Sequence, residues 1–554
     1  MRTWFYRAVI YACLAVVLTW PAAAQLGDVI PGADRTDTWN SLWSLNFWAD
    51  RLASGGVPWE VERLNFPAGG SLLISDPLGA TLAAPAVWLL GPHIAFSLLA
   101  LAQMTFSGLV MHGFSEAFLT WRRGTGEAGM GPFVSGVAFI SAPLLASHLH
   151  NGATETWSAG WTVLAIWMVW ADTVQPSRRR VLAAALALLG ASMAHWYGGI
   201  VAFIFAGYIT AFGVGERPQK GLMRRFTGLL IGLTLTVGLA GSTAQIHRAD
   251  DSIVEIKSSE MVRFTTRSTG AADPLTYVMP GDHRSPDFRK LSANNERYMH
   301  SHYLGLVVLG LGAWGWVRRR RHTGFLVLGS VTCLLLSLGP VLMHSARPVL
   351  ILGDLGIPLP FLFLESLPGF DALSLPWKLA LGPVIGLSVL SGLAVDQRGR
   401  RVILAALSLI ALDALWMAPT AERPRVLSVA PSPALQGLKS APPGAVINYP
   451  LAHGRGYLAE QIQHGKPIAG MLNRVGNEPA NRLWRRIQAE SRKDPDTFHR
   501  AVSSTAERLG IRYLVIHTDP DAEPDMYTSA VTQMERLFGV PEWGQGQTRV
   551  IQLW

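Results

Sequence analysis

The stretch HYLGLVVLGLGAWGWVRRRR, residues 302–321, decides the class of fold. Residues 302–317 are almost entirely apolar, and Arg318 to Arg321 follow at once. An apolar segment of roughly 17–25 residues can cross a bilayer as a helix, and arginines gather at the cytoplasmic ends of such helices. The stretch therefore predicts a transmembrane helix, somewhat short, that ends on the cytoplasmic side.

Similar apolar stretches recur along the chain. They cover residues 5–24, 94–117, 132–149, 156–174, 179–194, 197–213, 226–246, 302–317, 323–343, 376–395 and 401–418. Several are shorter than the roughly 20 residues that a straight span needs, which suggests either longer true spans or shelter by neighbouring helices. The sequence predicts a mainly α-helical, polytopic transmembrane bundle of about eleven spans.

The composition agrees with a membrane protein. Of the 554 residues, 49% are apolar and only 15% are charged, whereas soluble domains carry about 25% charged residues. A net charge of +9 would suggest nucleic acid as the partner of a soluble protein. Here the basic residues cluster at the ends of apolar stretches, so we expect a lipid bilayer and no nucleic acid. The two cysteines, Cys13 and Cys333, lie in apolar stretches and offer no disulfide framework.

The arginine pattern predicts the orientation. With the N-terminus inside, every inward connection carries Arg or Lys, and the short outward turns 148–155 and 195–199 carry neither. The inward connections are 119–131, 175–180, 214–225, 318–322 and 396–401. This alternation follows the positive-inside rule and predicts a multi-pass protein of the cytoplasmic membrane. PAAAQ at 21–25 also resembles a signal-peptidase site, so cleavage after residue 24 stays open.

The orientation leaves large segments outside. Residues 1–419 are expected to form the membrane domain, with outward loops 25–93, 247–300 and 344–375, and residues 420–554 a soluble extracytoplasmic domain. That last part has β-like runs alternating with helix-like segments, which is typical of a small α/β domain. The runs are 444–449, 511–516 and 548–553, and the helical segments lie around 480–491, 495–508 and 523–537.

The first outward loop carries acids before a Trp-rich segment. Asp28, Asp34 and Asp37 precede TWNSLWSLNFWADRL, whose aromatic residues recur at helical spacing. Such an amphipathic helix is expected to lie in the membrane interface, where nearby carboxylates suit chemistry on a lipid-linked headgroup. Asp37 is equally well placed as the N-cap of a helix that starts at Thr38.

These features resemble the GT-C class of integral membrane glycosyltransferases, and most closely a bacterial group within it. The resembling motifs are LTWP at 18–21, TWNSLW at 38–43, LNFPAGGSLLISDPLG at 64–79, HNGATETW at 150–157, YLG at 303–305, LPGFDALSLPWK at 367–378 and QHGKPIAGMLNR at 463–474. The resemblance implies a catalytic acid in the first loop, which acts as base or orients the acceptor. Asp37 is the best match and Asp34 the second.

The resemblance also implies the reaction. A hexosyl- or pentosyltransferase of the bacterial inner membrane would move a sugar from a polyprenyl-phosphate donor to an extracytoplasmic acceptor, which is an envelope polysaccharide, a lipid or a protein. The alternatives are a non-catalytic assembly factor of the envelope and a transporter of lipid-linked sugars. Members that bind metal carry paired acids in a second outward loop. This chain has only Glu155 there, near His148 and His150, so no metal ligands are predicted and a need for Mg or Mn stays open.

The leaving phosphate needs positive charge or hydrogen-bond donors. The candidates are Lys378, Arg263, Arg267 and His195. Lys378 also fits a snorkelling interface lysine, and the resembling group usually has arginine at this position.

Three more residues complete the predicted site. Glu155 and His150 flank an outward turn, and Tyr197 belongs to the HWYGG turn at 195–199, which could stack on a sugar. The plainer alternatives are a carboxylate that faces water and an aromatic residue of the interfacial belt.

Overall fold

The structure is a computed structural model of the chain. The structure describes residues 2–33, 36–124, 128–212, 222–248, 270–279, 302–319, 321–345, 347–351, 355–365, 373, 375–417, 426–429, 432–449, 456–469, 478–490, 494–517 and 548–554. The chain forms two compact units. The first comprises residues 1–38, 75–242 and 257–427, and the second comprises residues 39–74, 243–256 and 428–554.

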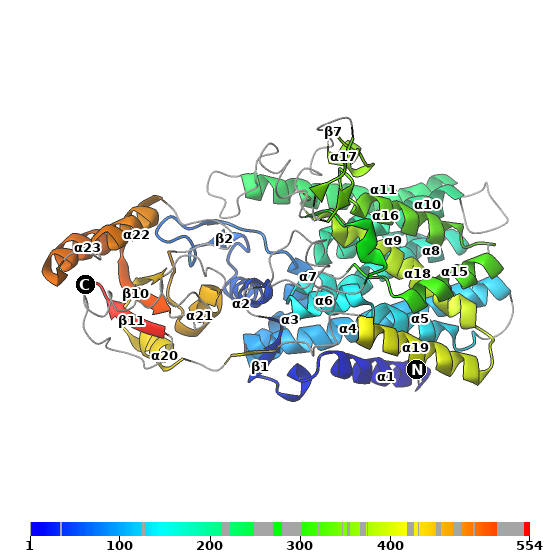
Figure 1. Cartoon of the computed structure of the whole chain (residues 1–554), viewed down its shortest axis with the longest axis horizontal. Helices are drawn as coiled ribbons and strands as arrows, with labels where there is room; N and C mark the ends of the chain where they lie inside the picture. The colour runs from blue at the N-terminus through cyan, green and yellow to red at the C-terminus, as the bar shows by residue number, and fades with distance from the viewer. Residues whose placement is uncertain are drawn as a thin grey trace. The chain divides into compact units, whose positions relative to one another are not determined.

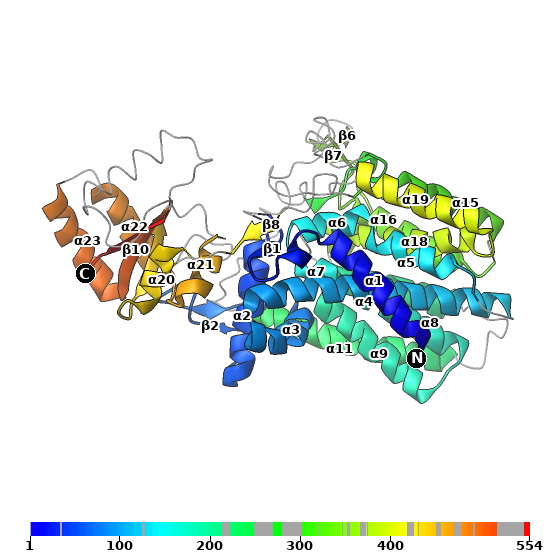
Figure 2. The ribbon, with the colours of Figure 1, turned by 90° about the horizontal axis from the view of Figure 1, so that it is seen from below.

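The first unit is a bundle of helices that lie side by side (Figure 1, Figure 2). Its helices are α1 (Arg2–Leu18), α3 (Pro77–Leu90), α4 (Pro92–Arg123), α5 (Gly131–Ile140), α6 (Pro143–His150), α7 (Thr154–Trp157), α8 (Ala159–Val174), α9 (Arg178–Ala194), α10 (Trp196–Phe212), α11 (Leu222–Arg248), α15 (Leu306–Arg318), α16 (Gly324–Ser337), α17 (Phe361–Glu365), α18 (Leu381–Val395) and α19 (Arg400–Met417). Short 3₁₀ turns are η1 (Ala22–Ala24), η3 (Pro274–Tyr277) and η5 (Pro376–Ala380). Short strands are β1 (Val29–Pro31), β4 (Met343–His344), β5 (Arg347–Pro348), β6 (Leu350–Ile351), β7 (Leu355–Gly356) and β8 (Val426–Ser428).

Each apolar stretch identified in the sequence is helical over most of its described residues, and the exceptions include residues 302–305 and 338–343. Three helical segments are both long and apolar enough to span a membrane, namely 92–123, 131–150 and 376–395. Shorter apolar helical segments, such as Leu306–Arg318 and Gly324–Ser337, have 10–17 residues. The protein is thus a mainly α-helical membrane protein, and the total of about eleven spans stays a prediction.

Glycines let the helices approach closely. A Cβ atom added to Gly392 of α18 would lie 2.4 Å from the carbonyl oxygen of Gly131 in α5. One added to Gly315 of α15 would lie 2.2 Å from the carbonyl oxygen of Leu390 in α18. Small residues at such crossings are the usual way in which membrane helices gain packing energy.

Charged side chains join three of the arginine-bearing connections at one end of this bundle. Arg123 at the end of α4 pairs with Asp396, which follows α18. The neighbouring Arg122 donates from Nε to the carbonyl oxygen of Arg321, 3.2 Å away, beyond α15. The connections 119–131, 318–322 and 396–401 therefore share one end, and the first residues of α8 and α18 lie at the other.

The second unit contains a three-stranded sheet in the order β11-β10-β9. The predicted strands form as β9 (Ala445–Tyr449), β10 (Ile511–His517) and β11 (Thr548–Gln552), with β10 parallel to β9 and antiparallel to β11. Helices α20 (Pro433–Ser440), α21 (Gly456–His464), α22 (Glu478–Glu490) and α23 (Pro495–Leu509) accompany it. The predicted helix at 523–537 lies outside the described residues.

Part of the first predicted loop belongs to this second unit. It supplies the Trp-rich helix α2 (Thr38–Ser54) and the hairpin of β2 (Glu60–Val61) and β3 (Gly70–Ser71). The indole Nε1 of Trp43 donates to Oε1 of Gln461, 2.8 Å away and buried. The aromatic face of α2 that contains Trp43 is thus buried in protein, where the amphipathic pattern alone suggested an interfacial position.

Candidate functional site

A buried ion pair forms the centre of the site. Nζ of Lys378 donates to Oε1 of Glu155 over 2.8 Å, although the residues are 223 positions apart. Lys378 lies in η5 directly before α18, and Glu155 lies in the single turn α7 before α8. Each residue is only 8% exposed, so the lysine head does not snorkel to water.

The lysine favours the ionised form of the glutamate. Burial alone would raise the pKa of Glu155, but the Lys378 ammonium and its hydrogen bond hold that pKa below its ordinary value. Nζ of Lys378 also lies 5.8 Å from the ring centroid of Tyr197 and 5.9 Å from that of Trp377. One carboxylate and two aromatic faces thus stabilise this buried cation.

A second acid stands next to the pair. Asp76 caps the start of α3, where its Oδ1 accepts from the backbone N–H of Gly79 over 2.8 Å. Its Oδ2 accepts from the hydroxyl of Ser158 over 3.3 Å. Burial, with the nearby charge of Glu155, raises the pKa of Asp76 to about 7.

The segment of Asp37 reaches the turn that carries Glu155. Thr38 follows Asp37, and a Cβ atom added to Gly152 would lie 2.3 Å from Oγ1 of Thr38. Gly152 also has a φ of +66°, which favours glycine. Asp37 itself is half-buried directly before the first residue of α2. The tertiary structure thus brings this acid close to the turn that precedes Glu155.

Aromatic and imidazole rings surround the Trp377 side of the site. The ring of His148 is stacked on Trp377 with centroids 5.1 Å apart, and the ring of His302 lies 5.0 Å from the same indole. His302 accepts or donates at Nδ1 with the hydroxyl of Thr276, 3.1 Å away. The hydroxyl of Tyr197 accepts from the backbone N–H of Leu375 over 2.7 Å, which ties α10 to the residues before η5.

His195 lies in the link between α9 and α10. It is 3% exposed, and its ring centroid is 5.6 Å from that of Tyr197. Burial, with the charge of Lys378, lowers the pKa of His195 well below its ordinary value. The imidazole is therefore neutral near pH 7. The sequence suggested His195 as a cation for the phosphate, whereas the structure makes it a neutral hydrogen-bonding group.

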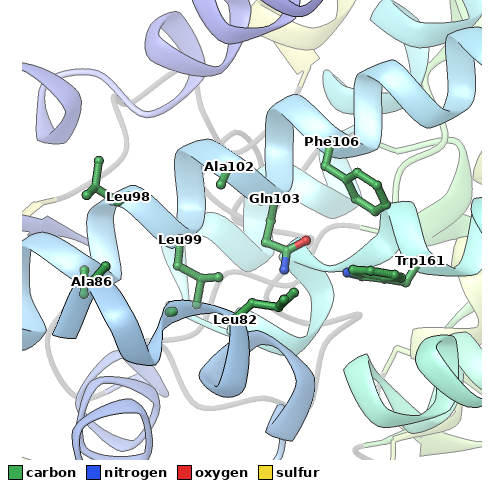
Figure 3. A pocket seen from close by; sticks show the side chains of 10 residues that line it. Leu82, Ala86, Leu98, Leu99, Ala102, Gln103, Phe106 and Trp161 are labelled. Carbon is green, nitrogen blue, oxygen red and sulfur yellow. The ribbon is translucent and has the colours of Figure 1, made fainter. Parts of the chain in front are cut away.

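An apolar cleft of about 280 Å³ lies between α3, α4 and α8 (Figure 3). Figure 3 shows the amide of Gln103 and the indole of Trp161 facing the side chain of Leu82 across it. Nε1 of Trp161 has no hydrogen-bond partner among the described residues. Trp161 is one helical turn beyond Ser158, which bonds to Asp76, so the polar end of the cleft lies near the charged cluster.

The predicted site residues divide into three sets. The structure brings Glu155, Lys378, Tyr197 and His195 together, and it places Asp37 near the same turn. His150 is buried at the end of α6, close in sequence to Gly152. Asp34, Arg263 and Arg267 lie outside the described residues.

Sequence reasoning missed Asp76, Ser158 and Trp377 as members of the cluster. Asp76 stands before Pro77, which is the pattern of a helix N-cap. That pattern signalled its local role and gave no sign of its tertiary neighbours.

A metal site does not appear in the described part of the chain. No group of three His, Cys, Asp or Glu residues within those ranges is arranged to hold a metal ion. His302, which the sequence placed at the start of a span, instead bonds to Thr276.

Comparison with known proteins shows the fold. No protein-family model and no curated protein sequence matches this chain. Several solved structures are similar across most of it, and three of them are ArnT, AglB and AftD. ArnT from Cupriavidus metallidurans bound to undecaprenyl phosphate has a TM-score of 0.53 and 14% identity over 99% of this chain and 98% of its own. The archaeal oligosaccharyltransferase AglB from Archaeoglobus fulgidus, in complex with an inhibitory peptide and a dolichol-phosphate, has a TM-score of 0.51 and 12% identity. The match covers 93% of this chain and 69% of AglB.

The third is the arabinofuranosyltransferase AftD from Mycobacteria, with a TM-score of 0.51 and 14% identity over 95% of this chain and 37% of its own. All three are glycosyltransferases of the GT-C class. At these identities the likeness shows the fold, and it confirms the GT-C fold expected from the sequence motifs.

Proposed function

We propose that this GT-C-fold membrane protein is a glycosyltransferase that takes a sugar from a polyprenyl-phosphate donor. The observation that carries the proposal is the buried Lys378–Glu155 pair at one end of the helical bundle. A buried cation there is suited to a phosphate that arrives on a membrane lipid. The similar ArnT and AglB structures contain undecaprenyl phosphate and a dolichol-phosphate, respectively, which supports a donor of this class.

The chemistry needs two groups of the protein. The acceptor hydroxyl attacks the anomeric carbon of the sugar, a new C–O bond forms, and the bond from that carbon to the phosphate oxygen breaks. The polyprenyl phosphate leaves with the electron pair, and Lys378 stabilises its charge. Asp37 takes the proton of the acceptor hydroxyl or orients that hydroxyl, and general-base help is typically worth roughly 10²–10⁴-fold.

The donor's chain needs an apolar site that leads to the charged cluster. The cleft between α3 and α4 has this property, because its walls are apolar and its polar end lies near Ser158 and Asp76. We assign the first isoprene units to it.

We also propose that the site faces away from the cytoplasm in the bacterial inner membrane. The C-terminal α/β domain would lie on the same outer side, where the acceptor is an envelope polysaccharide, a lipid or a protein. Cysteine labelling of intact spheroplasts tests this on a background that lacks Cys13 and Cys333. A cysteine at Thr518 should react and one at Thr125 should not, and the reverse result contradicts the orientation.

Sugar transfer by the purified protein tests the function. Wild type should transfer sugar from at least one of a panel of undecaprenyl-phosphate-linked hexoses and pentoses, scored by release of undecaprenyl phosphate. Asp37→Asn should be slower by roughly 10²-fold or more, whereas Asp50→Asn, a change in the exposed Asp50–Arg63 pair, should be as fast as wild type. Equal rates for Asp37→Asn and wild type would remove Asp37 from catalysis. A wild type that neither binds undecaprenyl phosphate nor turns over any donor would refute the proposed function.

A further inference from the structure

His195 is a buried polar group that has no hydrogen-bond partner among the described residues. Both ring nitrogens, Nδ1 and Nε2, are inaccessible to solvent, and neither has a partner among the described residues. Leaving such groups unpaired costs free energy, so native proteins almost always pair them. Two ring nitrogens without a described partner beside a proposed substrate site therefore indicate that the ligand supplies their hydrogen-bond partner.

The local backbone holds this ring in place. His195 ends α9 in an extended conformation, and α10 begins at the next residue. A Cβ atom at Gly198 would lie 2.5 Å from Oγ1 of Thr162 and 3.4 Å from Nδ1 of His195. Glycine at this position thus lets the start of α10 pack closely against Thr162 of α8.

The chemistry of the ring selects the ligand group. A neutral imidazole presents one N–H donor and one nitrogen acceptor, and the low pKa of His195 keeps it in this form. The ionised phosphodiester of the donor carries no O–H group, so it cannot donate to the acceptor nitrogen of the ring. It prefers the nearby ammonium of Lys378. A hydroxyl both donates and accepts, so it matches the ring.

A second buried polar group without a described hydrogen-bond partner lies next to the ion pair. The hydroxyl of Thr156, the residue after Glu155, is buried and also has no partner among the described residues. The site thus combines a charged pair, two aromatic ring faces and polar groups without a described partner, which come from Lys378–Glu155, Tyr197 and Trp377, and His195 and Thr156. Such a set suits a molecule that carries one anionic group and several hydroxyls. A sugar phosphate has this composition.

We propose that His195 binds a hydroxyl of the transferred sugar and so determines which sugar the enzyme accepts. This inference rests on the proposed function and deepens it, because it divides the donor between two residues. Lys378 contacts the phosphate, and His195 contacts the sugar.

The test compares stability, lipid binding and transfer for two variants. His195→Leu replaces the ring by an apolar side chain of similar volume, and His195→Gln keeps one donor and one acceptor. Because the ring makes no bond to the described protein, His195→Leu should melt at the wild-type temperature or above it. It should bind undecaprenyl phosphate like wild type but transfer sugar with a kcat/KM lower by roughly 10-fold or more, and His195→Gln should recover part of that loss.

A change at a second buried hydroxyl serves as the control. Ser97→Ala removes another buried hydroxyl that lacks a described partner, and it should leave transfer from undecaprenyl-phosphate glucose, mannose and arabinofuranose unchanged. If His195→Leu transfers every one of these sugars at the wild-type rate, His195 does not contact the sugar, and the proposed function stands without it. If His195→Leu unfolds at a lower temperature and His195→Gln restores stability but not transfer, the ring is structural and the inference is wrong. If wild type binds undecaprenyl phosphate and its sugar-bearing forms with no transfer, the proposed reaction fails and the inference falls with it.

Discussion

Separate substitutions of Glu155 and Lys378 should destabilise the protein strongly, and the double substitution should not. Both side chains are 8% exposed, and their charged atoms are 2.8 Å apart. Glu155→Gln leaves the lysine charge buried without its partner, and Lys378→Gln does the same to the carboxylate. Breaking a buried ion pair in this way costs about 3–5 kcal/mol, while replacing both charges is close to neutral.

The assay is a double-mutant cycle of melting temperatures in detergent. Each single variant should melt clearly below wild type, the double variant should recover most of the loss, and Lys439→Gln, an exposed lysine of α20, should change nothing. Activity gives the second readout. Lys378→Arg should keep most transfer and undecaprenyl-phosphate binding, whereas the double variant should fold but lose both.

Two results would refute the reasoning. Single variants that melt like the Lys439→Gln control would mean that the pair is not buried in the folded protein. A stable double variant that binds undecaprenyl phosphate as wild type does would mean that Lys378 is a structural partner of Glu155 and not a phosphate ligand.

Three other predictions concern the surroundings of the pair. Asp76→Asn should keep the helix cap, and its stability advantage over wild type should grow as the pH rises from about 4 to 7, because the folded pKa near 7 exceeds the unfolded value; pH-dependent melting curves that stay parallel would contradict this. Ala102→Phe should fill the apolar cleft and weaken undecaprenyl-phosphate binding more than Leu89→Phe, which enlarges a residue on the exposed part of α3; equal binding by the two variants would place the chain elsewhere. Acidification should lower the melting temperature of wild type more than that of the Glu155→Gln/Lys378→Gln double variant below about pH 4.3, since protonation of Glu155 removes a stabilising charge pair; an equal loss in both proteins would count against the pair.

The sequence was sufficient to predict local structure. Hydrophobic stretches became helices because a backbone within a bilayer must satisfy its own hydrogen bonds, and a helix does this within one segment. The sequence also predicted where helices begin and end. The predicted helix 495–508 is preceded by Asp494, whose side chain accepts from the backbone N–H of Thr497, and is followed by Gly510 with a φ of +70°. Motifs spread along the chain also indicated the GT-C fold.

Only the tertiary structure decided which polar side chains meet. Hydrophobic periodicity reports one face of one helix, and it does not say which distant segment covers that face. Lys378 and Glu155 therefore looked like two separate interface residues until packing buried them against each other. The burial of His195, the neighbours of Asp76 and the bond from Trp43 to Gln461 have the same origin. Each depends on long-range contacts, whose energies are set by burial and charge at close range and not by sequence spacing.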